Sequence, residues 1–158
     1  MNRVAIGIVL LAAGASHLVA SDTSPPSRTA AANSATGQGT IRFGDHGDGV
    51  GTFVFDVAQS GGVSGSLLFA AEGHVSYPDI IVRMDKIESA TVEARSVTLS
   101  GAGRLHDDPV SVIVTAFDGK GTRKPDTFAI TCTNSEGRVV FEARGDVFIG
   151  DIRVGESR

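Results

Sequence analysis

Hydrophobic and polar residues alternate along most of the chain after Gly37, in short runs that end at glycine-rich or polar segments. Phe53, Phe55 and Val57 share one face of such a run, and Val112 and Val114 share one face of another. A repeat of two residues is typical of strands with one buried face, and the intervening Gly, Asp and Asn residues suit tight turns. The pattern predicts antiparallel hairpins.

The segment from Ile80 to Ala94 is longer than the other runs and has a mixed pattern. Ile80, Val82 and Met84 fit one strand, which we expect to continue through Val92 past a bulge. A helix over residues 85–93 is the alternative. We favour the strand because this stretch contains poor helix formers and no evident helix cap.

These runs predict an all-β domain, either an antiparallel sandwich or a closed barrel of about eight to ten short strands. The chain of 158 residues contains 20 glycines, eight phenylalanines and no tryptophan, which agrees with strands and tight turns. Its one cysteine excludes an intrachain disulfide. Cys132 shares a face with Phe128 and Ile130, so we expect a buried, unreactive thiol.

The N-terminus has the pattern of an export signal. Arg3 precedes a charge-free apolar run over residues 4–15, which is too short to span a bilayer comfortably. We therefore predict a cleaved signal peptide at 1–21, a disordered linker at 22–36 and a single β domain at 37–158. An uncleaved anchor helix is the alternative. The expected location is outside the cell or at its surface, with the periplasm as the alternative, and without membrane insertion after cleavage.

The charge distribution argues against nucleic acid as a partner. The formal net charge is −4, and no basic cluster is larger than Arg123-Lys124. The longest polar loop inside the domain runs from Asp118 to Asp126. Such a loop can carry recognition, although a solvated hairpin loop is the interpretation that we favour.

Two clusters offer residue types that carry chemistry. Asp45, His46 and Asp48 could hold a divalent cation, but neither an EF-hand order nor a His-x-x-x-His pair is present, and the same residues suit a hairpin turn. His106-Asp107-Asp108 could supply acid–base chemistry, but adjacent strand residues point to opposite faces. We favour a turn at both places.

No motif predicts catalysis or a cofactor. A Gly-x-Ser-x-Gly elbow is absent, since the segment 62–65 has the wrong spacing, and no glycine-rich phosphate loop precedes a helix. We therefore assign no catalytic residue, no cofactor and no enzymatic activity.

Several strand and turn segments carry a resemblance to a known family, namely Gly39-Thr40-Ile41, Phe53-Val54-Phe55-Asp56-Val57, Gly65-Ser66-Leu67-Leu68-Phe69, Gly101-Ala102-Gly103-Arg104-Leu105, Val110 to Asp118 and Asp126 to Ile130. Together they resemble a small β-rich domain of exported bacterial proteins, the post-COAP type. The resemblance covers most of Gly37 to Val154, and the turn at Leu105 to Asp108 departs from it, because a small Val-Asn-Gly-like turn is expected there. It implies a β-rich extracellular domain that binds or supports and brings no catalytic residues.

Three functions from different classes follow. The leading one is a non-catalytic binding or structural module outside the cytoplasm, whose partner is an extracellular protein or a glycan. The second is a barrel that binds a small molecule in its interior, with Gly101 and Gly103 either leaving room or admitting side chains from the opposite sheet. The third is a hydrolase or isomerase built on His46, His74 or His106, which requires a histidine and an acid to converge in one pocket.

Overall fold

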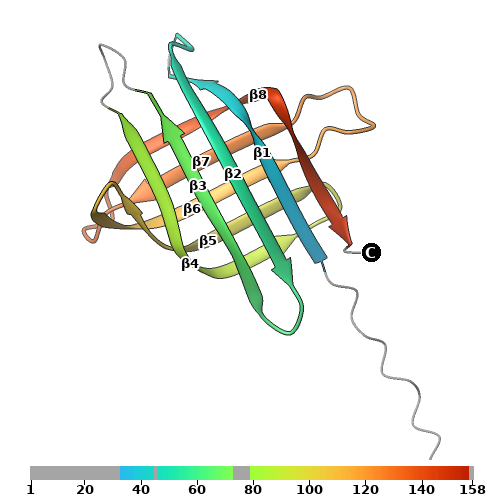
Figure 1. Ribbon diagram of the computed structural model, residues 1–158, viewed down its shortest axis with the longest axis horizontal. Helices are drawn as coiled ribbons and strands as arrows, with labels where there is room; N and C mark the ends of the chain where they lie inside the picture. The colour runs from blue at the N-terminus through green and yellow to red at the C-terminus, as the bar shows by residue number, and fades with distance from the viewer. Residues whose placement is uncertain (1–32, 45, 73–78, 157–158) are drawn as a thin grey trace, which may run out of the picture.

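The computed structural model describes residues 33–44, 46–72 and 79–156, and in these ranges the chain forms eight strands and no helix (Figure 1). The all-β prediction is therefore confirmed for this part of the chain. The strands are β1 (Asn33–Phe43), β2 (Gly49–Gln59), β3 (Val63–Ala71), β4 (Ile80–Val92), β5 (Ser96–Leu105), β6 (Asp108–Phe117), β7 (Thr127–Thr133) and β8 (Val139–Glu156).

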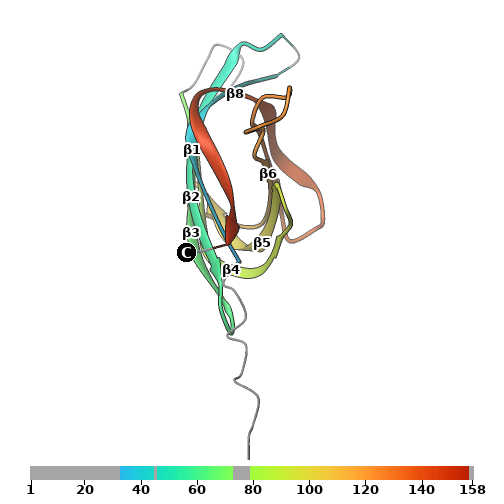
Figure 2. The ribbon, with the colours of Figure 1, turned by 90° about the vertical axis from the view of Figure 1, so that its right-hand side faces the viewer.

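The sheet closes on itself. Each strand pairs antiparallel with the next, and β1 also pairs antiparallel with β8, from Asn33 opposite Glu156 to Ile41 opposite Val147. Of the two architectures that the sequence predicts, the structure is the closed barrel. In the side view the barrel is flattened, with β1, β2 and β3 along one wall and β5 and β6 along the other (Figure 2).

The alternation of hydrophobic and polar residues in the sequence corresponds to an alternation between the interior and the exterior of the barrel. Along β2, Phe53, Phe55 and Val57 are buried, while Val54 and Asp56 face solvent. The same period of two holds in β6 and β7, where Cys132 is fully buried as predicted. Burying one face of every strand around a closed ring produces a single apolar core.

The strand that the sequence predicts from Ile80 through Val92 is also confirmed. β4 pairs with β5 from Val82 to Val92, with register shifts between Met84 and Lys86 and between Ile87 and Ser89. The alternative helix is wrong because these two bulges keep Met84, Ile87 and Ala90 on the buried side, although their spacing no longer follows a period of two.

The domain begins earlier than the sequence predicts. Residues 33–36, which composition assigns to a linker, form the start of β1, and Ala35 is buried. Closure of the barrel gives these residues ladder partners on both sides, in β2 and in β8, and this pairing outweighs their polar composition. Residues 22–32 of the expected linker and the expected signal peptide at 1–21 lie outside the described residues.

Because neighbouring strands are antiparallel, the hairpins alternate between the two ends of the barrel. The hairpins β2–β3, β4–β5 and β6–β7 lie at the same end as Asn33 and Glu156, and we call this the terminal end. The hairpins β1–β2, β5–β6 and β7–β8 lie at the other end, which we call the distal end.

Candidate functional site

The interior of the barrel is filled by phenylalanine rings. Phe53 and Phe128 stack with their ring centroids 4.0 Å apart and their planes 6° from parallel. Phe69 lies parallel to Phe128 at 6.1 Å and also contacts Phe43 and Phe141 edge-on or tilted. Eight-stranded barrels are just wide enough for side chains to fill, and these rings occupy the space that a ligand would need.

Inward-facing glycines accommodate the rings and leave no gap. A Cβ atom added at Gly37 would lie 2.3 Å from the Phe55 ring, and one added at Gly51 would lie 2.3 Å from the Phe69 ring. At Gly101 and Gly103 the space is taken by the backbone of β4, because an added Cβ would lie 2.0 Å from the Lys86 oxygen and 2.4 Å from the Arg83 oxygen. The two glycines of β5 therefore leave no room for a ligand; what fills the space is the neighbouring strand.

The predicted metal candidates lie at the distal end. Asp45 is outside the described residues, while His46 and Asp48 are exposed in the β1–β2 hairpin. Among the residues that the structure describes, no group of three His, Cys, Asp or Glu side chains is placed to hold a metal ion.

The second cluster is a tight turn. His106 and Asp107 connect β5 to β6, both are exposed, and Asp108 begins β6. His106 has a φ of 54°, which suits Asn or Gly better than His, and its N–H donates to the Ile81 carbonyl at 2.7 Å. No hydrogen bond in the described part of the chain joins the side chain of His46 or His106 to an acid. His74 lies outside the described residues.

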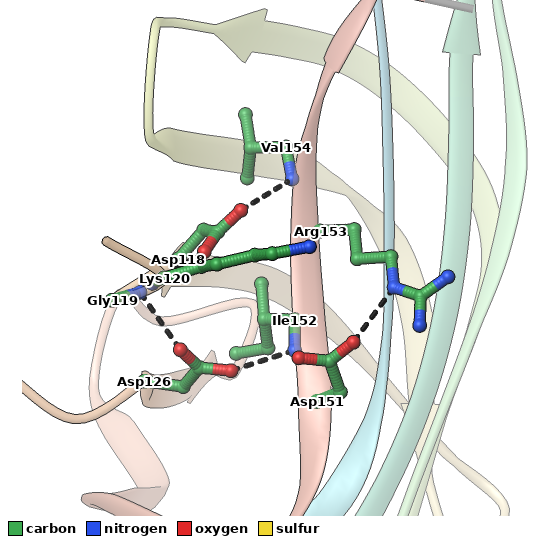
Figure 3. Close-up of polar contacts among 8 residues, drawn as sticks. All are labelled: Asp118, Gly119, Lys120, Asp126, Asp151, Ile152, Arg153 and Val154. Carbon is green, nitrogen blue, oxygen red and sulfur yellow. Dashed lines mark hydrogen bonds and ion pairs between the residues drawn. The ribbon is translucent and has the colours of Figure 1, made fainter. Parts of the chain in front are cut away.

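Sequence reasoning missed the two acids that organise the terminal end. Asp118 is only 9% exposed; its carboxylate accepts the N–H of Lys120 at 2.8 Å and that of Val154 at 3.3 Å. The Asp126 carboxylate accepts the N–H of Gly119 at 2.7 Å and that of Ile152 at 2.7 Å (Figure 3).

The two carboxylates fasten the loop over residues 118–126 to β8 (Figure 3). Both lie at the ends of the polar loop that the sequence marks out: Asp118 directly follows β6, and Asp126 directly precedes β7. Charged acceptors for backbone N–H groups are among the stronger hydrogen bonds in proteins, so this loop is fixed and does not behave as a simple solvated hairpin.

One depression adjoins this loop, and a second depression meets it at β8 and β1. The first, of about 680 Å³, is lined by polar and charged residues of β1, β8 and the loop, and the second, of about 320 Å³, continues over β1 and β2. Thr36 and Arg153 line both. The remaining lining residues are Ser34, Asp118, Lys120, Val154 and Gly155 in the first, and Gly37, Gln38, Val54, Phe55, Asp56 and Asp151 in the second.

The outer wall of β2, β3 and β4 carries apolar side chains. Val50, Val54, Leu68 and Ile81 are each between 39% and 49% exposed, and Val54 lies directly opposite Leu68 in the β2–β3 ladder. We call these four residues the outer apolar face. Strands β2 and β3 run along the wall that faces the viewer in Figure 1.

Comparisons of this chain with protein-family models, with curated proteins and with solved structures found no match. The described part of the chain contains no helix long and apolar enough to cross a membrane.

Proposed function

We propose that this chain is a non-catalytic β-barrel module that acts outside the cytoplasm and binds its partner on its outer surface, not in its interior. The observation that carries the proposal is the packed interior, in which Phe53, Phe69 and Phe128 stack on one another. A barrel that carries a small molecule needs an open mouth and an unfilled core.

The outer surface of the barrel has accessible surfaces for a partner, whereas the interior is filled by side chains. The two depressions and the outer apolar face lie on strands of the barrel or on a loop that is fastened to a strand. Surfaces held in this way are suited to recognition because little conformational entropy is lost on binding. The export pattern at the N-terminus and the resemblance to post-COAP-type domains support a role outside the cytoplasm.

Native mass spectrometry of the protein purified from the cells that produce it tests the proposal. We expect a chain that begins near residues 16–22 and carries no apolar molecule. An apolar small molecule that is retained in the native spectrum and lost on denaturation would refute the proposal, and so would a cytoplasmic chain that keeps its N-terminal residues.

A further inference from the structure

We propose that the outer apolar face binds the same face of a second copy of this chain, in a symmetric dimer whose two-fold axis runs along β2. This inference goes beyond the proposed function, because it names what covers one outer surface and does not depend on where the chain is located. The wall formed by β1, β2 and β3 is flat in the side view (Figure 2). The flat faces of two sheets can pack on each other about 10 Å apart.

The strand register places uncharged side chains in one straight row across this wall, from β8 to β4. Each residue of the row lies opposite the next one in the neighbouring strand, and Thr52 on β2 is its middle residue. The Thr52 hydroxyl already donates to the Ala70 carbonyl at 3.3 Å. No charge would have to leave water when this row is covered, so it suits the middle of an interface. The row consists of Ile149, Thr40, Thr52, Ala70 and Ile81.

The neighbouring rows are apolar in the middle and charged at their ends. On the side of the terminal end, a row runs from Asp151 through Gln38, Val54 and Leu68 to Arg83. Its two ends therefore carry opposite charges.

The row on the side of the distal end repeats this arrangement with the signs exchanged. Arg42 lies opposite Val50 in the β1–β2 ladder. On the other side of β2, Glu72 directly follows β3 and lines a hollow together with Val50. A positive and a negative charge therefore flank Val50 on either side of the same strand.

A two-fold axis along β2 brings these opposite charges together. Rotation about this axis places each residue over the partner's residue in the same row on the other side of β2. Asp151 then meets the partner's Arg83, Arg42 meets the partner's Glu72, and each pair occurs twice. An axis across the strands would instead place Leu68 over the partner's Glu72, which is unfavourable because the carboxylate would lose its hydration without gaining a counter-ion.

The charges that this arrangement requires are available. Arg42, Glu72 and Arg83 take part in no ion pair among the residues that the structure describes. Asp151 binds Arg153 through one carboxylate oxygen at 2.7 Å, and its other oxygen remains as an acceptor. Charged pairs at the rim of an interface determine its orientation more than its affinity.

Two hollows on this wall complement the side chains that protrude from it. The first hollow, of about 440 Å³, lies over β2, β3 and β4, and the axis brings the partner's Ile149, which is 63% exposed, over it. The second depression lies over β8, β1 and β2, where it receives the partner's Leu68. Because the two hollows lie on opposite sides of β2, each faces a protruding part of the partner. The first hollow is lined by Val50, Thr52, Ala70, Ala71, Glu72, Asp79, Ile80 and Ile81, and its two acids attract the partner's Arg42.

The size of the face indicates a weak dimer. Neighbouring strands lie about 4.8 Å apart and alternate residues about 6.8 Å apart, so three rows across five strands cover roughly 500 Å². A stable complex buries about 800 Å² per partner. We therefore expect a dissociation constant on the order of 100 µM, so that the chain is monomeric in dilute solution and dimeric only when it is concentrated.

Sedimentation equilibrium of the chain, purified as for the mass-spectrometric experiment, measures the association from about 5 µM to about 1 mM. Val54→Lys places two like charges at the axis and should weaken association at least about tenfold. Ile113→Lys is the matched control, because Ile113 is equally exposed (50% against 49%) but lies on β6, in the opposite wall. It should change the dissociation constant by no more than about twofold.

A mixing experiment tests the charge pairs. Arg42→Glu and Glu72→Arg each place like charges opposite one another in a homodimer, so each variant alone should associate about tenfold more weakly. In an equal mixture, the heterodimer has opposite charges at both positions and should regain the parent affinity to within about threefold. Because both variants must be folded to associate in the mixture, this recovery also excludes unfolding as the cause of the weaker association.

The position of the axis has its own test. Asp56 follows Val54 on the outer side of β2, so it meets the partner's Asp56 at the axis and limits the contact there. Asp56→Asn removes this repulsion and should tighten association about threefold.

The proposal is overturned if the chain remains monomeric at about 1 mM, if Ile113→Lys weakens association as much as Val54→Lys, if the mixed variants do not associate, or if Asp56→Asn leaves the affinity unchanged. Each of these results leaves the mass-spectrometric test of the proposed function unaffected, so the two failures are distinguishable.

Discussion

At the scale of single residues, the glycines that face the core are fitted to the phenylalanine rings. Gly51 in β2 lies beneath Phe69, and a Cβ added there would also lie 3.3 Å from the ring of Phe43. The Phe69 ring is itself packed against Phe43, Phe128 and Phe141, so it cannot move aside without disturbing the other rings.

We therefore expect Gly51→Ala to lower the free energy of unfolding by about 1–3 kcal/mol, the usual cost of overpacking a core. Urea denaturation measures this. Gly62→Ala is the matched control, because nothing lies within 4 Å of its added Cβ, and it should change stability by less than about 0.5 kcal/mol. Equal stability of the two variants would show that the rings are loosely packed.

Burial also determines the chemistry of Cys132. Removal from solvent raises the pKa of its thiol from the ordinary 9.0 to about 12. We expect no reaction with a thiol reagent at pH 8 in the folded protein, and complete reaction in denaturant. Rapid labelling of the native protein would contradict the buried position.

The raised pKa of the Cys132 thiol makes the free energy of unfolding depend on pH. The folded chain retains the thiol proton up to a pKa of about 12, whereas the unfolded chain releases it near 9.0. The contribution of this thiol to the free energy of unfolding is therefore fully present below pH 9 and decreases as the pH rises towards 12. Cys132→Ala should show a smaller loss of unfolding free energy over this range, and equal slopes would argue against the raised pKa.

At the scale of elements, the β6–β7 loop depends on Asp126, whose carboxylate joins the loop at Gly119 to β8 at Ile152. Asp126→Asn keeps the shape of the side chain but replaces one carboxylate oxygen by an NH2 group. This group is a donor and cannot accept the hydrogen bond of the backbone N–H that it faces. We expect a loss of about 1–3 kcal/mol in unfolding free energy, together with faster amide exchange at Ile152.

Asp107→Asn serves as the control for Asp126→Asn, since Asp107 is exposed in a two-residue turn. It should change the unfolding free energy by less than about 0.5 kcal/mol. If Asp126→Asn were as stable as this control, the loop would be fixed by its backbone contacts alone.

Most strands could be predicted from the sequence because a period of two is visible wherever one face is buried, as in β2 and β6. The start of β1 could not, because Asn33 to Thr36 have a linker-like composition and are ordered by pairing with β2 and with β8, the latter more than a hundred residues away in the chain. The first depression is hidden for the same reason: Thr36, Lys120 and Arg153 lie far apart in the sequence, and barrel closure places them together.

At the scale of the whole molecule, closure removes the free edges that an open eight-stranded sheet would expose. β1 pairs with β2 on one side and β8 on the other, and β8 also supplies the buried Ile152. An unpaired edge is a template for association with other chains.

A chain that ends at Asp146 lacks every β8 residue that pairs with β1. We expect this truncated chain to associate or to remain unfolded, as measured by size-exclusion chromatography with light scattering. A Gly-Ser pair inserted between Gly61 and Gly62 should leave the protein monomeric, because lengthening a hairpin costs little. A monomeric, folded truncated chain would show that β8 is dispensable for closure.

The pairing of Asn33 with Glu156 also determines how the barrel responds to mechanical force. Tension between the two ends of the domain acts across the first rung of the β1–β8 ladder, perpendicular to the strands. The hydrogen bonds are then loaded one at a time, as in a zipper, and do not share the load as they would in shear. We therefore expect the domain to open at the β1–β8 seam when it is pulled by its ends.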